Sequence, residues 1–221
     1  MQQTSVDISH LLAGGVLVFS FVLLYQARLF ALLNVFAAQS VVLALAVAWQ
    51  AHIQGAKHLY ITAALALIMK GIIIPVVLKK IVRQMHIHRT IEPVVSVNLT
   101  LLAGVALTIL SIMVVFPVAQ NQAGLAREDL AFALTIILLG MLMMITRRNA
   151  VSQVIGFMAL ENGLVMAATG AKGMPLVVEV SVAFSVLIAF FVFGIFIFRI
   201  REHFGDIDID ILSRQRGDVH D

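Results

Sequence analysis

The sequence contains no cysteine and few charged residues. The lack of cysteine excludes structural disulfides, thiolate-held iron–sulfur clusters and a cysteine nucleophile in this chain. Only 12% of the 221 residues are charged and 61% are hydrophobic, with a mean hydropathy of +1.03, whereas about a quarter of a soluble domain is charged. We therefore expect a chain that buries its surface in a bilayer, with membrane lipids and no nucleic acid among its partners.

Long apolar runs make up most of the chain. A membrane-spanning helix needs about 20 mostly apolar residues. The flank from Met1 to Ser9 carries no Lys or Arg, so we interpret the first run as a retained helix and not as a signal peptide. We predict an all-α integral membrane protein with seven transmembrane helices, at 9–26, 29–51, 58–79, 95–119, 127–146, 150–170 and 175–198.

The Lys and Arg residues between these runs are unevenly distributed. The loops after the first, third and fifth runs, together with the C-terminal tail, carry 11 of them, and the other side carries only Lys57, Arg127 and Lys172. Such an excess is typical of the cytoplasmic side. We expect an outside N-terminus and a cytoplasmic C-terminus, in the cytoplasmic (inner) membrane of a bacterium or archaeon.

The loops divide the chain into four parts. These are three helices with a basic cytoplasmic loop (1–94), a connecting helix (95–126), a three-helix unit (127–200) and a cytoplasmic tail (201–221). The basic loop suits lipid headgroups or a partner subunit. The tail alternates Asp with Ile, which suits either a solvated segment or an extended arm laid on a neighbouring subunit.

Three charged residues lie inside apolar runs: Lys70, Glu161 and Glu179. A charge at the centre of a spanning helix costs about 2.5–3.5 kcal/mol on insertion scales, so such residues usually face a bundle interior or an ion path. We therefore regard all three as proton-relay candidates. The seven histidines lie near the ends of the runs or outside them, so no helix presents a histidine pair for a membrane haem.

Glu161 precedes Asn162 and Gly163 in the middle of its run. Desolvation disfavours a buried carboxylate and a nearby cation favours it, so a balance between the two allows proton exchange. The alternative is a protonated Glu that hydrogen-bonds a neighbouring helix. Gly156 and Gly163, with Ala159, make this helix thin enough for close approach of another helix.

Lys70 is followed by Gly71 and, five residues on, by Pro75. Because proline frees the carbonyl four residues earlier, we expect a bent or broken helix beside the charge. Lys70 is then either a relay member or half of an ion pair with a partner subunit. Glu179 lies one turn into its run, where a helix N-terminus stabilises an anion, so it suits either that role or proton exit.

The block from Arg147 to Gly163, RRNAVSQVIGFMALENG, resembles the corresponding block of the hydrogenase-4 component E family. The likeness extends to Lys70–Pro75, to 175–179 and to the tail. The last three runs are also similar to the K subunit of NADH:quinone oxidoreductase. The resemblance implies a non-catalytic membrane subunit of a complex-I-like assembly of the group 4 [NiFe]-hydrogenase or formate hydrogenlyase type, contributing to proton or ion translocation and to assembly of the membrane arm.

The resemblance also implies partners and roles. Antiporter-like and quinone-oxidoreductase-H-like subunits would lie beside the chain in the membrane, with peripheral hydrogenase-like subunits attached. Nickel–iron and iron–sulfur centres would lie only in those partners. The family's Glu-Asn-Gly corresponds to Glu161, Asn162 and Gly163, its lysine to Lys70 and its last-helix Glu to Glu179. We regard Asn162, Gly163, Pro75 and Ser185 as supporting polar or helix-bend positions.

The chain departs from these patterns at two positions. The buried Glu of the K subunit aligns with Met158, one turn before Glu161, and Ser185 occupies the place of an Asp in the last run. Serine passes a hydrogen bond but holds no charge. Two other functions remain open: a scaffold subunit without a relay role, and a stand-alone secondary ion transporter, which typically shows inverted repeats.

Overall fold

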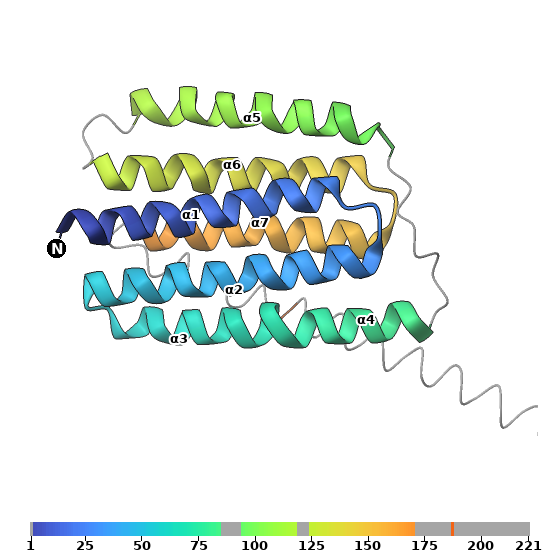
Figure 1. Cartoon of the computed structure of the whole chain (residues 1–221), viewed down its shortest axis with the longest axis horizontal. Helices are drawn as coiled ribbons and strands as arrows, with labels where there is room; N and C mark the ends of the chain where they lie inside the picture. Colours follow the sequence, from blue (N-terminus) through green and yellow to red (C-terminus); the bar gives the residue numbers. More distant parts are fainter. Residues whose placement is uncertain (1, 85–93, 119–123, 171–186, 188–221) are drawn as a thin grey trace, which may run out of the picture.

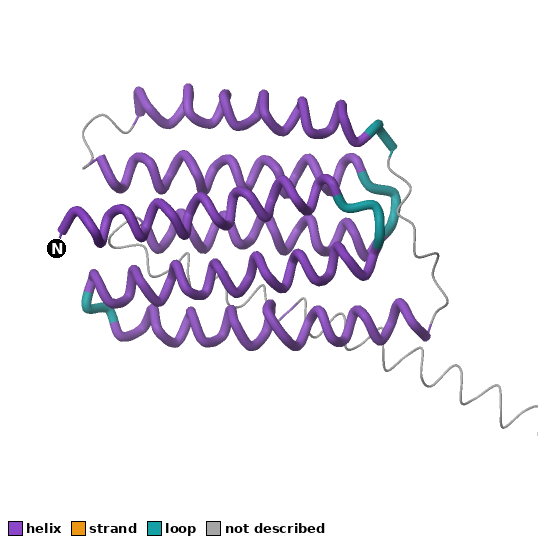
Figure 2. Tube along the Cα trace, in the orientation of Figure 1, coloured by secondary structure: helices purple, strands orange, loops and turns teal. Residues whose placement is uncertain are grey.

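The computed structural model describes residues 2–84, 94–118, 124–170 and 187. These residues form helices joined by short loops, and no strand occurs among them (Figure 2). In chain order the helices are α1 (Gln2–Tyr25), α2 (Leu29–Gln54), α3 (Lys57–Ala66), η1 (Leu67–Ile73), α4 (Ile74–Gln84), α5 (Val97–Val118), α6 (Gly124–Thr146) and α7 (Ala150–Gly170).

Six helical spans in the described part of the chain are long and apolar enough to cross a membrane. They coincide with the first six predicted runs, although α1 begins at Gln2, earlier than expected. This chain is therefore a multi-pass helical membrane protein. The seventh predicted run, 175–198, and the tail lie outside the described residues, as does most of the basic loop.

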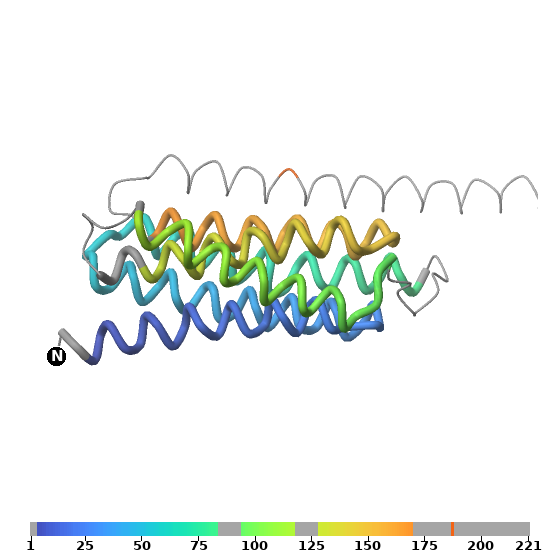
Figure 3. The backbone as a smooth tube through the Cα atoms, turned by 90° about the horizontal axis from the view of Figure 1, so that it is seen from above, coloured from blue at the N-terminus to red at the C-terminus, as the bar shows by residue number. Residues whose placement is uncertain are grey.

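The helices lie side by side along one common direction (Figures 1 and 3). In Figure 1, α5 forms one edge, α6 follows, α1 and α7 overlap in the middle, and α2 separates them from α3 and α4 at the other edge. The N-terminus of α1 and the C-termini of α2 and α7 share the left side of the view with the N-terminus of α6. We call this side the N-terminal end of the bundle.

The third span contains the predicted irregularity. It runs without a break from Lys57 to Arg83, and its centre, η1, is a π-helix. The N–H of Ile74 donates to the carbonyl of Met69, five residues earlier, whereas an α-helix uses the fourth. Pro75 has no N–H to offer to Gly71. The expected bend or break therefore takes the form of a widened turn, a feature frequent at functional sites.

Close contact between α6 and α7 depends on three glycines. A Cβ on Gly140 would lie 2.5 Å from the backbone nitrogen of Leu160. A Cβ on Gly156 would lie 3.2 Å from the carbonyl oxygen of Gly140, and one on Gly163 would lie 2.9 Å from the carbonyl oxygen of Ala133. The structure thus confirms the thin face predicted at Gly156 and Gly163, and adds Gly140 on the opposing helix.

The turn between α6 and α7 holds a buried cation. Arg147 is one of the charged residues between the fifth and sixth predicted runs, yet it is only 2% exposed. Its Nη2 donates to the carbonyl oxygen of Leu24 on α1, and its own carbonyl accepts from the Gln153 side chain. Arg147 therefore fastens the hairpin to α1 instead of facing solvent.

Buried apolar side chains form two separate clusters, one towards each end of the bundle. The cluster at the N-terminal end includes Ala13, Leu43, Leu59, Ile136 and Val165. The cluster at the opposite end includes Leu24, Leu33, Ile74, Met143 and Ile155. Five spans contribute to both clusters, and polar side chains occupy the level between them.

Candidate functional site

An ion pair lies at the centre of the bundle. Lys70 of η1 places its Nζ 3.1 Å from Oε1 of Glu161 on α7, and each side chain is 2% exposed. A cation and a carboxylate withdrawn from solvent each carry a desolvation penalty of several kcal/mol, which their mutual attraction offsets only with good geometry and further hydrogen bonds. The partner of Lys70 is thus found inside the chain, and no partner subunit is needed to supply it.

A chain of hydrogen bonds extends from this pair across the bundle. Lys70 Nζ donates to Oδ1 of Asn162 at 3.0 Å, and Asn162 Nδ2 donates to Oε1 of Gln39 on α2 at 3.3 Å. Gln39 Nε2 donates to the hydroxyl of Ser20 on α1 at 2.7 Å, and that hydroxyl donates to the carbonyl oxygen of Val16 at 3.0 Å. Because each amide is held at both ends, the chain orients the acceptor that Lys70 meets.

We call this set the polar layer; it comprises Ser20, Gln39, Lys70, Glu161 and Asn162. All five are between 0% and 3% exposed. Along each helix the layer is flanked by members of both apolar clusters. The pair therefore sits in a medium of low dielectric constant, where electrostatic interactions are stronger than in water.

Lys70 and Glu161 are the two ionisable members of the polar layer. Serine and the amides hold hydrogen bonds but do not titrate. The Nζ–Oε1 distance is that of a hydrogen bond, so one proton can pass from the ammonium to the carboxylate and leave a neutral amine and a neutral acid. The total charge stays the same, while the Oδ1 acceptor of Asn162 favours the protonated lysine.

The other predicted residues fall in different places. Gly163 packs against α6, and Pro75 is buried near the start of α4. Met158, at the position of the K subunit's buried Glu, is 0% exposed and belongs to an apolar cluster. Glu179 and Ser185 lie outside the described residues, and their predicted roles stay predictions.

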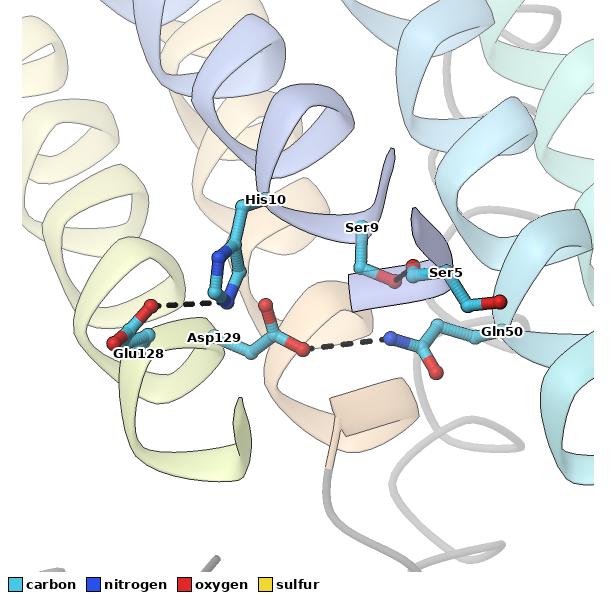
Figure 4. A network of polar contacts seen from close by, with 6 residues as sticks. All are labelled: Ser5, Ser9, His10, Gln50, Glu128 and Asp129. Carbon is cyan, nitrogen blue, oxygen red and sulfur yellow. Dashed lines mark hydrogen bonds and ion pairs between the residues drawn. The ribbon is translucent and has the colours of Figure 1, made fainter. Parts of the chain in front are cut away.

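A second polar group, at the N-terminal end, was not predicted from the sequence. Nε2 of His10 lies 2.9 Å from Oε2 of Glu128, and Nε2 of Gln50 donates to Oδ2 of Asp129 at 3.4 Å (Figure 4). Asp129 is only 6% exposed. The sequence signal for this group is the pair of acids, Glu128 and Asp129, at the start of the fifth predicted run.

A helical membrane bundle with an ion pair insulated between two apolar clusters defines the class of this protein. Within that class, the chain is 28% identical to hydrogenase-4 component E of Escherichia coli (strain K12) over 184 residues, 82% of this chain and 85% of the relative. The same values hold for hydrogenase-4 component E of Shigella flexneri. It is 29% identical to an uncharacterized protein of Mycobacterium tuberculosis, over 92% of this chain and 94% of the relative.

No family model matches the chain, and no solved structure matches it.

Proposed function

We propose that this chain is a non-catalytic subunit of the membrane arm of a multi-subunit complex of the hydrogenase-4 type, and that Lys70 and Glu161 lie on its proton or ion path. The observation that carries the proposal is the buried Lys70–Glu161 pair at 3.1 Å. Intramembrane ion pairs typically mark ion routes and proton relays. The similarity to hydrogenase-4 component E supports the choice of complex.

The electron-transfer chemistry belongs to other subunits in this proposal. The chain has no cysteine, and no group of three or more His, Cys, Asp and Glu side chains suited to a metal ion occurs in the described residues. Nickel–iron and iron–sulfur centres would lie in hydrogenase-like partners. Antiporter-like and quinone-oxidoreductase-H-like subunits would flank the chain in the cytoplasmic membrane.

Within this complex, the polar layer supplies a fixed charge pair that can shift one proton internally. The hydrogen bonds through Asn162, Gln39 and Ser20 fix the position of the Lys70 ammonium. The π-helix that carries Lys70 places its side chain inside the bundle. A charge change in a neighbouring subunit would then bias the proton between Nζ and Oε1. The scaffold alternative assigns the same contacts to assembly alone.

Glu161→Gln separates the relay from the scaffold, because it keeps the shape and hydrogen bonding of the side chain and removes its titration. We expect the tagged variant to purify from its native membranes with the same partner subunits as the wild type, identified by mass spectrometry. Proton translocation by sealed vesicles should fall by about 100-fold or more, since a positioned proton-transfer group typically contributes about 10²–10⁴-fold. Asp7→Asn, an exposed acid of the same chain, is the matched control.

The contrary outcomes are distinct. A wild-type chain that purifies alone and folded contradicts membership of the complex and favours the stand-alone transporter. A Glu161→Gln complex that assembles and translocates normally contradicts the relay and leaves the scaffold.

A further inference from the structure

A small cavity lies at the N-terminal end of the bundle, close to the second polar group. It has a volume of about 20 Å³, which is room for about one water molecule. Four helices enclose it. Its polar lining consists of Ser9, Gln50, Asp129 and Thr169, and its apolar lining includes Ala13, Leu43 and Met166.

Asp129 is the titratable side chain in this lining. Its carboxylate accepts from the neutral amide of Gln50, and the titratable groups that act on it from α1 and α6 are His10 and Glu128. These two pair with each other at 2.9 Å, so no cation is paired directly with Asp129 among the described contacts. Figure 4 shows the imidazole of His10 close to both acids. Asp129 is thus a buried acid with a neutral hydrogen-bond partner beside space for water.

One side of the cavity, lined by Leu43 and Met166, faces the polar layer. Leu43 follows Gln39 by four residues on α2, and Met166 follows Asn162 by four on α7. Residues four apart share one face of a helix, and their separation along the axis is about 6 Å. The cavity therefore lies on the same inter-helix seam as the polar layer, with one layer of apolar side chains between them.

We propose that this cavity is a hydrated vestibule on one side of the membrane, and that Asp129 is the group through which the polar layer exchanges protons with that side. The role of Asp129 in proton exchange rests on the proposed function, whereas the vestibule rests only on the cavity and its lining. From the distribution of Lys and Arg, this side is expected to be the outside.

The lining suits water and a proton rather than a metal ion. Gln50 presents an N–H to Asp129, and its own Oε1 accepts from Gln54 at 3.2 Å. The hydroxyls of Ser9 and Thr169 donate to backbone carbonyls. A hard cation needs about six oxygen ligands directed at it, whereas the side chains of the lining offer one carboxylate and two hydroxyl oxygens.

The cysteine-free chain allows a direct test of the vestibule with Ag⁺, a thiol-reactive ion small enough for a narrow space. In sealed membrane vesicles of either orientation, Ag⁺ should block the thiols of full-length Ser9→Cys and Ala46→Cys, which line the cavity, from one side only. Ala51→Cys is the matched control, since it lies nearer the helix end yet is 0% exposed and packed in a cluster. We expect at least tenfold faster block of Ala46→Cys than of Ala51→Cys.

Block of Ala46→Cys as slow as that of Ala51→Cys, or block from both sides, overturns the vestibule. The role of Asp129 is tested by proton translocation of the intact complex with Asp129→Asn, for which at least a tenfold loss with normal assembly is expected, and with Asp7→Asn as the control. Normal translocation by Asp129→Asn alongside loss in Glu161→Gln overturns this inference and leaves the proposed function standing. Normal translocation by both variants overturns the relay role of Glu161 and the proton-exchange role of Asp129, while the Ag⁺ result alone decides the vestibule.

Discussion

Lys70 and Glu161 each make the burial of the other tolerable. Both are 2% exposed and lie 3.1 Å apart, and Asn162 supplies Lys70 with a further acceptor. Removing one partner of a buried pair leaves an uncompensated charge, whereas replacing both partners by apolar side chains of similar volume is often neutral or stabilising. The pair is therefore better explained by function or specificity than by stability.

A comparison of single and double variants measures this dependence. Glu161→Ala should lower the free energy of unfolding by about 3–5 kcal/mol, because Lys70 stays buried without its carboxylate. The double variant Lys70→Met with Glu161→Leu should recover most of that loss. Titration of the purified full-length chain with a denaturing detergent gives both values, and a double variant as unstable as Glu161→Ala would contradict the interpretation.

Depth in the membrane is easier to predict from sequence than orientation about the helix axis. Lys70 and Glu161 are predictable as buried charges because each interrupts an apolar run. Their mutual contact is not, since spanning helices are apolar on nearly every face and carry little amphipathic signal. Gln39 is a polar residue inside an apolar run, but only the folded structure shows that it bonds to Asn162.

Helix α7 approaches α6 so closely that side chains are excluded at the crossing. Membrane helices associate through packing of small residues, because lipid and protein are equally apolar. Gly140 and Gly156 face each other across this contact, and a methyl group added at Gly140 would come nearest to the backbone of Leu160. The contact holds Glu161 and Asn162 at a fixed level relative to α6.

Gly140→Ala should therefore destabilise the bundle, since the added methyl group would lie 2.5 Å from the backbone nitrogen of Leu160. Overpacking of this kind costs about 1–3 kcal/mol. Gly14→Ala is the control, because nothing lies within 4 Å of its new methyl group and alanine is the better helix former by up to about 1 kcal/mol. Thermal denaturation followed by size-exclusion chromatography should separate them, and equal melting temperatures would argue against the close crossing.

The elements themselves are largely predictable, and the irregular turn only in part. In lipid, a helix is the only structure in which a single segment satisfies all its own backbone hydrogen bonds, so apolar runs of about twenty residues predict helices. Gly71 and Pro75 indicate a disturbance beside Lys70, but sequence alone does not distinguish a kink from a π-turn. The Asp129 cavity is not predictable, because it depends on how four helix faces meet.

The whole molecule has a central bundle and a more exposed helix at its edge. Several large apolar side chains of α5 are more than half exposed, among them Leu102 at 65% and Met113 at 68%. The polar layer lies on α1, α2, η1 and α7, and the cavity is lined by α1, α2, α6 and α7. Helix α5 therefore carries none of the described site residues. Its exposed face is open to lipid or to a neighbouring subunit.

Reporter fusions test the number of spans and their direction. Alkaline phosphatase, which is active only outside the cytoplasm, should be active when fused after Gly55 and inactive after Asn149. A fusion after Asp221 should be inactive, because the predicted span 175–198 returns the chain to the cytoplasm. Activity after Asp221, with the other two as expected, would contradict the seventh span.

The pairing of Lys70 also sets an order of events during synthesis. Asn162, which directly follows Glu161, lies 92 residues after Lys70, and at about 5–20 residues per second this is a delay of roughly 5–20 s. For that interval the third span carries a charge whose counter-ion has not yet been made. We therefore expect the third span to stay in the translocation machinery, or bound to an insertion chaperone, after its own synthesis is complete. Its integration into the membrane is then finished only when α7 has been made.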